Sequence, residues 1–148
     1  MSTLIIDELR TTLEQEFTVV TRREVLTVRP NLMFYNDPAG TFTMTIKQGS
    51  TTIIAKSLTM TEILTGTSWT ANQYHYGVIN FEFATPVALL VDTTYTAVLS
   101  SSGYVFSESS YLGWVKSYTN HLNTVAGATS SDLENPFDVE IWDYKIWS

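Results

Sequence analysis

Residues 41–47 alternate strictly between apolar and polar side chains. Phe42, Met44 and Ile46 occupy one set of positions, and threonine or lysine occupies the positions between them. Successive side chains of a strand point to opposite faces of a sheet, so this pattern predicts a strand with one buried and one solvated face. A Gly-Ser pair separates it from a second β-rich run at residues 51–57, which predicts a hairpin.

Similar patterns recur along the chain. Roughly eight or more short runs of strand character are separated by turn formers at intervals of about ten residues. A parallel α/β sheet needs crossover helices, and no repeating helical pattern is present. We therefore predict an all-β fold, an antiparallel and jelly-roll-like β-sandwich in one domain over residues 17–148. Within it, residues 58–69 predict a short helix or loop that stops at Gly66, and residues 74–83 predict one long strand.

The first segment, residues 1–16, is predicted to be a short N-terminal arm. Its apolar side chains fit a helix, which we favour, but alternate residues from Leu9 to Phe17 also fit an extended strand. Such an arm either covers an open end of the sandwich or reaches a neighbouring subunit, where it would serve as an assembly arm. The candidate arm residues are Ile6, Leu9, Leu13 and Phe17.

Charge and cysteine content exclude several classes of partner and site. The formal net charge of −7 repels a phosphate backbone, so nucleic acid is not an expected partner. With no cysteine there is no disulfide framework and no thiolate zinc site. No apolar stretch reaches the length of a membrane span and no signal peptide is recognisable, so we expect neither a membrane partner nor secretion.

Catalytic motifs are not recognisable in the sequence. His75 and His121 lie outside any nucleophile or zinc motif, and His75 is predicted to be partly buried among aromatic residues. Two nearby carboxylates suffice for glycoside hydrolysis, but the carboxylates in question are single ones on polar faces or at turns. They are Glu62, Glu82, Glu108 and Asp92. We predict no enzyme activity, no catalytic residue and no cofactor.

Asp132, Glu134 and Asp138 gather near the last predicted loop. Carboxylate oxygens bind Ca²⁺, but the spacing matches no EF-hand loop. A solvated acidic loop is the simpler interpretation, so no metal site is predicted.

Aromatic side chains are concentrated in the last third of the chain. Such residues serve as core packing, as buried anchors of a subunit interface, or as platforms on which sugars stack, and these alternatives stay open. The final strand has large apolar groups on both faces, which is typical of a strand that lies between two layers or is covered by a partner. The candidate interface or glycan-stacking residues are Tyr104, Tyr111, Trp114, Tyr118, Trp142, Tyr144 and Trp147, and Phe106 lies among them.

Four segments carry a resemblance to a known class of protein: RPNLMFYNDPAGTFTMTIKQG, YGVINFEFATPVALLVDTTYTAVLSSSGY, SSYLGWVKSY and NPFDVEIW. Together they resemble small jelly-roll modules of virion proteins from tailed bacteriophages. More loosely, they are similar to carbohydrate-binding-like sandwiches. The matching positions are fold residues, so the resemblance implies architecture more than activity.

The resemblance implies a non-enzymatic structural protein of the virion, made in the host cytoplasm. It favours a capsid decoration (cement) protein that binds the major capsid protein or other virion proteins and forms a homo-oligomer, with a trimer favoured. The alternative is a carbohydrate-binding or host-receptor-binding module of a tail or baseplate. The N-terminal arm would be a natural attachment element in the first case.

Overall fold

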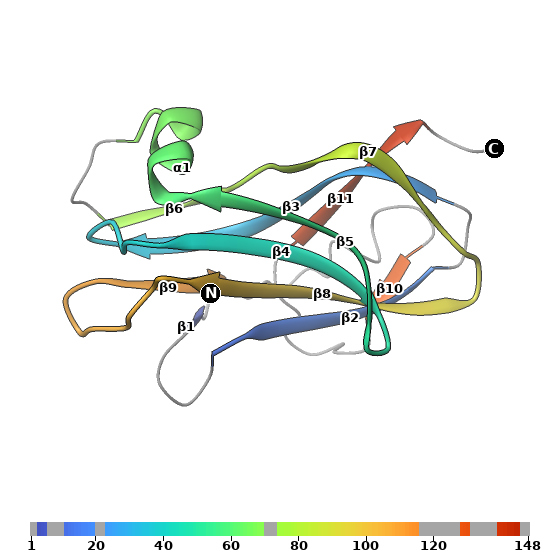
Figure 1. Cartoon of the computed structure of the whole chain (residues 1–148), viewed down its shortest axis with the longest axis horizontal. Coiled ribbons are helices and arrows are strands. Elements are labelled where there is room, and N and C mark those ends of the chain that lie inside the picture. Colours follow the sequence, from blue (N-terminus) through green and yellow to red (C-terminus); the bar gives the residue numbers. More distant parts are fainter. Residues whose placement is uncertain are drawn as a thin grey trace.

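The computed structural model is an all-β sandwich of two antiparallel sheets, one six-stranded and one five-stranded (Figure 1), which confirms the predicted fold class. The structure describes residues 3–5, 11–19, 23–69, 74–115, 128–130 and 139–145, and for 3–5, 23, 128–130 and 139–145 it describes the backbone alone.

The chain crosses between the two sheets several times, with the consecutive pairs β4–β5 and β6–β7 each staying within one sheet. The six-stranded sheet contains β1 (Thr3–Ile5), β3 (Arg23–Tyr35), β6 (Tyr74–Val78), β7 (Phe81–Leu89), β9 (Tyr111–Val115) and β11 (Val139–Lys145). The five-stranded sheet has the order β10 (Ala128–Ser130), β2 (Leu13–Val19), β8 (Thr93–Ser102), β4 (Thr41–Gln48) and β5 (Thr51–Thr59).

Strand β3 is the centre of the six-stranded sheet. It pairs with β6 and β7 along one edge and with β9 and β11 along the other. The predicted single strand over residues 74–83 is wrong, because β6 and β7 are separated at Ile79 and Asn80. The Ile79 N–H donates to the Pro30 carbonyl at 3.0 Å, and proline has no N–H to return the bond. The ladder is interrupted at that point.

The core lies between the inner faces of the two sheets. Phe42, Met44 and Ile46 are at most 1% exposed, so the alternation in β4 predicted their burial correctly. The predicted hairpin is confirmed. β4 pairs with β5 in an antiparallel register that places Thr41 opposite Thr59. Other large side chains buried in this layer include Trp114, Phe17, Phe34, Phe81 and Leu99.

The helical interpretation of the N-terminal arm is wrong from Leu13 onward. Leu13 and Phe17 are 3% and 1% exposed on the inner face of β2, which pairs with β8. Residues four apart share a face in a strand as well as in a helix, so the spacing of Leu13 and Phe17 fits both. Gln15 and Val19 are buried on the same face, which shows the two-residue period of a strand. Residues 13–16 therefore belong to the sheet, and Leu13 and Phe17 are core residues. Ile6 and Leu9 lie outside the described residues.

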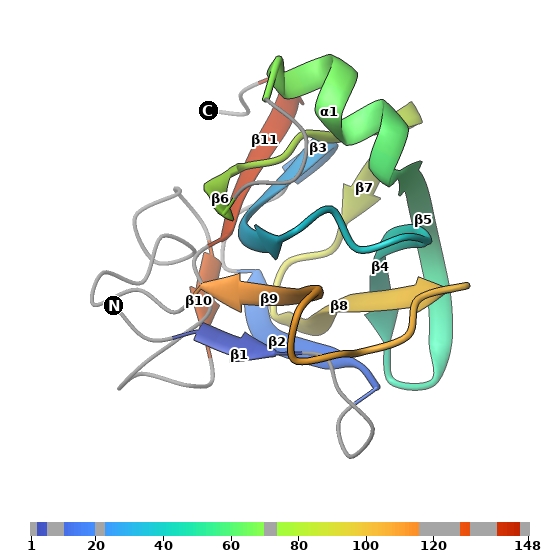
Figure 2. The same cartoon turned by 90° about the vertical axis from the view of Figure 1, so that its left-hand side faces the viewer.

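Helix α1 (Met60–Thr67) follows β5 directly and lies beside β6 (Figures 1 and 2). It begins with a capping box: the Glu62 N–H donates to the Thr59 hydroxyl at 3.1 Å, and the Thr59 N–H donates to the Glu62 carboxylate at 3.0 Å. It ends past Gly66, at Ser68, whose φ is 60°. In the described part of the chain, no helix has the length and apolar character required to cross a membrane.

Candidate functional site

Five aromatic rings form a continuous row on the outer face of the six-stranded sheet, which we call the tyrosine row: Tyr76, Tyr74, Tyr35, Tyr111 and Phe106. Neighbouring ring centroids are 5.1, 5.3, 5.2 and 6.0 Å apart in that order. Adjacent rings are tilted against one another by 35–52°. The row is assembled from segments that are far apart in the sequence.

Strand register creates this row. Tyr35 lies opposite Tyr74 on one side and opposite Tyr111 on the other. The residue before Tyr35 is Phe34, which is fully buried in the core, so Tyr35 points to the outer face. Figure 2 faces the end of the sandwich where β6, the end of β3 and β9 lie next to one another.

One end of the row is open to solvent. Tyr74, Tyr76 and Val78 are 47%, 53% and 38% exposed along β6, whereas Tyr35 and Tyr111 are half-buried. The Tyr76 hydroxyl donates to the Tyr74 hydroxyl at 3.0 Å. This hydrogen bond, with burial as the second cause, raises the pKa of Tyr74 well above the ordinary tyrosine value. The Tyr74 hydroxyl therefore stays protonated and neutral at physiological pH.

The other end of the row meets a hydroxyl-rich loop between β8 and β9. The Asn36 side-chain amide donates to the Ser109 carbonyl at 3.0 Å, and the Ser110 hydroxyl donates to the Asn36 carbonyl at 3.2 Å. The backbones of Ser107 and Ser110 exchange hydrogen bonds of 3.1 and 3.2 Å. These bonds hold the loop next to Tyr111 and leave Ser107 and Ser109 exposed.

The side of β6 that faces inward is supported by Trp69. Its ring stacks on His75 with centroids 4.6 Å apart and planes 7° apart, and it packs against Phe34 at 6.1 Å. His75 is half-buried, as expected, and it serves here as a packing surface. Trp69 therefore packs against the inner side of the strand that carries Tyr74 and Tyr76.

The structure places some of the predicted aromatic candidates in the tyrosine row and others in the core. Tyr111 and Phe106 belong to the tyrosine row. Trp114 is fully buried in the core, so it is neither a glycan platform nor an exposed anchor. Tyr104 packs edge-on against Phe42 at 6.1 Å and accepts a hydrogen bond from the Leu112 N–H at 3.1 Å, which gives it a structural role.

The side chains of the remaining aromatic candidates are not described by the structure. Tyr118 and Trp147 are outside the described residues. Trp142 and Tyr144 belong to β11, of which the backbone alone is described. The row residues Tyr35, Tyr74 and Tyr76 were not among the sequence candidates. The available signal was the alternation of tyrosines in Tyr74-His75-Tyr76 on the face opposite Ile79 and Phe81.

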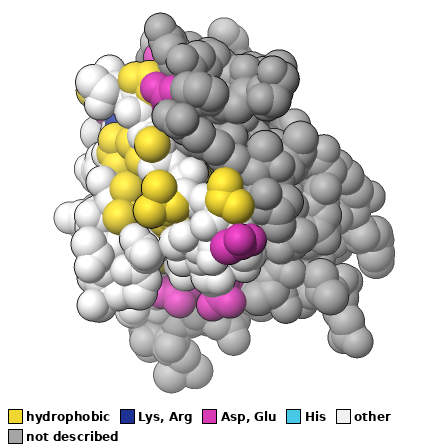
Figure 3. Space-filling view, turned by 90° about the vertical axis from the view of Figure 1, so that its right-hand side faces the viewer, with side chains coloured by type: hydrophobic (Ala, Val, Ile, Leu, Met, Phe, Trp, Pro, Cys, Tyr) yellow, Lys and Arg dark blue, Asp and Glu magenta, His cyan; other side chains and the backbone are white. Residues whose placement is uncertain are grey.

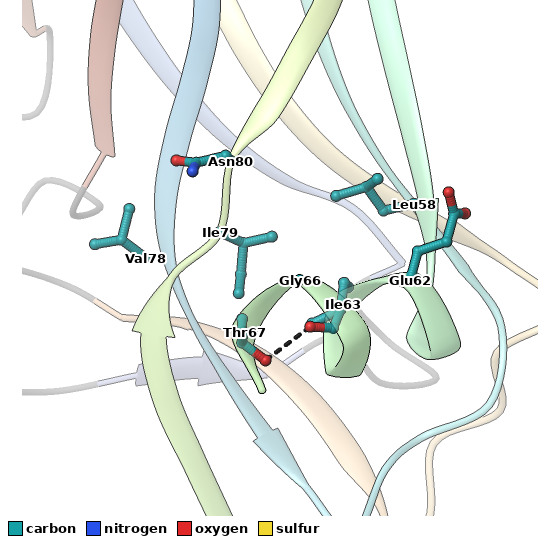
Figure 4. A pocket seen from close by; sticks show the side chains of 8 residues that line it. All are labelled: Leu58, Glu62, Ile63, Gly66, Thr67, Val78, Ile79 and Asn80. Carbon is teal, nitrogen blue, oxygen red and sulfur yellow. Dashed lines mark hydrogen bonds between the residues drawn. The ribbon is translucent and has the colours of Figure 1, made fainter. Parts of the chain in front are cut away.

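A cavity of about 200 Å³ separates α1 from the junction of β6 and β7 (Figure 4). Ile63 and Ile79 provide an apolar floor, and the Thr67 hydroxyl is occupied by a 2.7 Å bond to the Ile63 carbonyl. Glu62 also lines the cavity, but its carboxylate is held by the Thr59 cap, and these hydrogen bonds lower its pKa. This arrangement favours a structural carboxylate over an acid or base catalyst.

The other carboxylates considered for catalysis lie on separate elements. Glu82 is in β7, Asp92 in the β7–β8 turn and Glu108 in the β8–β9 loop, and all three are exposed. Among the described residues, no three His, Cys, Asp or Glu side chains are grouped so that they could hold a metal ion. Asp132, Glu134, Asp138 and His121 lie outside the described residues.

A second exposed surface is formed by the turn between β7 and β8. Leu90 and Val91 are 62% and 46% exposed there. The turn is nevertheless well held: the Leu90 N–H donates to the Tyr95 hydroxyl at 2.8 Å, and the Asp92 N–H donates to the Val19 carbonyl at 2.7 Å. Figure 3 faces this end of the sandwich and shows hydrophobic side chains gathered next to acidic ones.

No protein-family model matches this chain, and no curated protein is similar enough to identify a relative.

Proposed function

We propose that this protein is a non-enzymatic structural component of a tailed-phage particle, of the capsid decoration (cement) type. We further propose that it attaches to the shell through the β7–β8 turn. The observation that carries this proposal is the pair of consecutive exposed aliphatic side chains, Leu90 and Val91, at the tip of that turn. The resemblance of the chain to phage virion modules supplies the class of partner.

Turn tips normally carry Gly, Pro, Asn, Asp or Ser, because these residues suit turn geometry and water. Leu90 and Val91 instead place apolar surface in solvent, where it favours burial against another protein. Covering them fully contributes up to about 1.5–3 kcal/mol for each side chain. The contact is weak alone, but a symmetric oligomer on a symmetric shell repeats it and gains avidity.

The turn is also suited to docking because it is ordered before contact. The bonds from Leu90 to Tyr95 and from Asp92 to Val19 restrain it on both sides of the tip. A pre-ordered tip loses little conformational freedom on binding. On the described part of the face in Figure 3, acidic side chains lie next to the hydrophobic ones, which favours a partner surface with basic groups. The sequence suggested an attachment role for the N-terminal arm residues Ile6, Leu9, Leu13 and Phe17, of which Leu13 and Phe17 are buried and so do not supply the contact proposed here.

The test is binding to shells of the encoding phage that lack this protein, measured by co-sedimentation. The double variant Leu90→Ser, Val91→Ser should bind at least about tenfold more weakly than the wild type, which corresponds to about 1.4 kcal/mol. Val105→Ser is the matched control, because Val105 is 83% exposed in the β8–β9 loop, away from the turn. Failure of the wild-type protein to bind such shells, or equal binding by the double variant, would refute the proposal.

The oligomeric mass in solution provides an independent measurement. A trimer by light scattering supports the symmetric arrangement, and a strict monomer at micromolar concentration contradicts it.

A further inference from the structure

We infer that the tyrosine row is a carbohydrate-binding surface that takes an uncharged oligosaccharide. This inference goes beyond the proposed attachment to a shell, because it concerns a different face of the molecule and a different class of ligand.

The chemistry of the row matches what a sugar presents. A pyranose ring has apolar C–H faces that pack on aromatic rings and hydroxyl groups at its edge that need hydrogen-bond partners. The row supplies both: exposed ring surface at Tyr74 and Tyr76, and phenolic hydroxyls on four of its five members. The serine hydroxyls at Ser107 and Ser109 add donors and acceptors at its far end.

Charge selects among possible ligands. The chain carries a net charge of −7, yet none of the five row residues is charged. A neutral surface on an acidic protein disfavours anionic sugars and nucleotides, which the overall field repels, and it offers no ion pair to a cationic ligand. An uncharged sugar matches both the row and its surroundings.

The backbone that carries the row is held in place by strand pairing and packing. Cross-strand pairing places Tyr74, Tyr35 and Tyr111 side by side, and Trp69 braces β6 from the inner side. Tyrosine side chains lose little conformational entropy on binding, so an open surface of this kind can bind a flexible chain weakly but usefully. Because the row crosses three strands and continues into a loop, an extended oligosaccharide fits it better than a single sugar.

The position of the row leaves it free when the turn is occupied. Leu89, next to the turn tip, pairs with Arg23 at the start of β3, whereas Tyr74 pairs with Tyr35 at its end. The two surfaces therefore lie at opposite ends of the same central strand. A protein attached through Leu90 and Val91 presents the tyrosine row away from the attachment point.

The experiment begins with an array of neutral and acidic oligosaccharides probed with the wild-type protein. Affinity for the best neutral sugar is then measured by titration calorimetry. The variant Tyr74→Ala, Tyr76→Ala should lose at least about tenfold in affinity. Tyr74→Phe, Tyr76→Phe keeps the rings and removes the hydroxyls, so it should show a smaller loss. Thermal unfolding of each variant verifies that the fold is retained.

The shell-attachment variant Leu90→Ser, Val91→Ser serves as the matched control and should bind the sugar as the wild type does. The inference is overturned if no neutral oligosaccharide binds at millimolar concentration, or if the alanine pair binds as tightly as the wild type. It is also overturned if the alanine pair loses binding to shells, because the row would then be a protein interface. Sugar binding without shell attachment would instead refute the proposed function and leave the inference standing.

Discussion

Gly77 provides the space that the ring of Trp69 occupies: a Cβ at Gly77 would lie 2.7 Å from Cζ2 of Trp69. Gly77→Ala should therefore displace the Trp69 ring and disturb its stacking on His75. We expect a loss of about 1–3 kcal/mol in the free energy of unfolding, the usual cost of overpacking. Urea denaturation measures it, and the tryptophan fluorescence spectrum should change in the native state.

Gly66 is the matched control for this substitution. It lies within α1, and a Cβ there has no atom within 4 Å. Gly66→Ala should stabilise the protein by about 0.5–1 kcal/mol, because alanine restricts the unfolded chain and favours the helix. A stabilising Gly77→Ala would show that the Trp69 ring does not rest on β6.

The capping box of α1 gives the protein a specific pH dependence. Hydrogen bonds from the Thr59 backbone and hydroxyl lower the pKa of Glu62 below its ordinary value of 4.5. Because the folded pKa lies below the unfolded one, this interaction stabilises the protein above pH 4.5 and is lost as the pH falls through the folded pKa. NMR titration of the Glu62 side chain should show the lowered pKa directly, and Thr59→Ala should return it toward 4.5.

Thr59→Ala should also cost about 1 kcal/mol of stability at neutral pH, because it removes the N-cap. Glu62→Gln should flatten the part of the stability profile that lies below the ordinary glutamate pKa of 4.5. An unchanged profile in that variant would contradict the assignment of Glu62 to the cap.

Tyr95 links the core to the proposed attachment turn. It is 2% exposed, and its hydroxyl accepts the Leu90 N–H at 2.8 Å. Tyr95→Phe leaves that N–H without this partner, so the free energy of unfolding should fall by about 1–2 kcal/mol. Hydrogen exchange of the Leu90 amide should accelerate in the variant. If exchange there is unchanged while stability falls, the bond does not restrain the turn.

Trp114 and Tyr76 should respond to truncation in opposite ways. Trp114 is fully buried, so Trp114→Ala should lose about 3–5 kcal/mol of stability. Tyr76 is 53% exposed, so Tyr76→Ala should change stability by only about 0.5 kcal/mol while weakening sugar binding. Chemical denaturation and calorimetric titration of the two variants separate the structural role from the binding role.

Local periodicity predicted the fold class and much of the core. The alternation of Phe42, Met44 and Ile46 identified their buried face correctly, because side chains in a strand depend only on the period of two. Local periodicity could not assign the secondary structure at Leu13 and Phe17, because their spacing fits a helix and a strand alike. Their pairing with β8 decides between these structures, and that contact is distant in sequence.

The candidate surface was harder to predict because it depends on register. Tyr35, Tyr74 and Tyr111 become neighbours through two strand pairings that no local pattern specifies. The break between β6 and β7 depends on Pro30, which belongs to a different strand.

The central position of β3 has a consequence for folding kinetics. β3 precedes its partners β6, β7, β9 and β11 in the sequence, and several of its pairs join distant residues, as Val28 with Phe81 and Val28 with Ile141 illustrate. Contacts between residues so distant in sequence give a high contact order, which slows folding. During synthesis, β3 lacks a partner until β6 and β7 emerge, and the edge that pairs with β11 stays open until residues 139–145 are made. In that interval the open edge is exposed to aggregation and to chaperones.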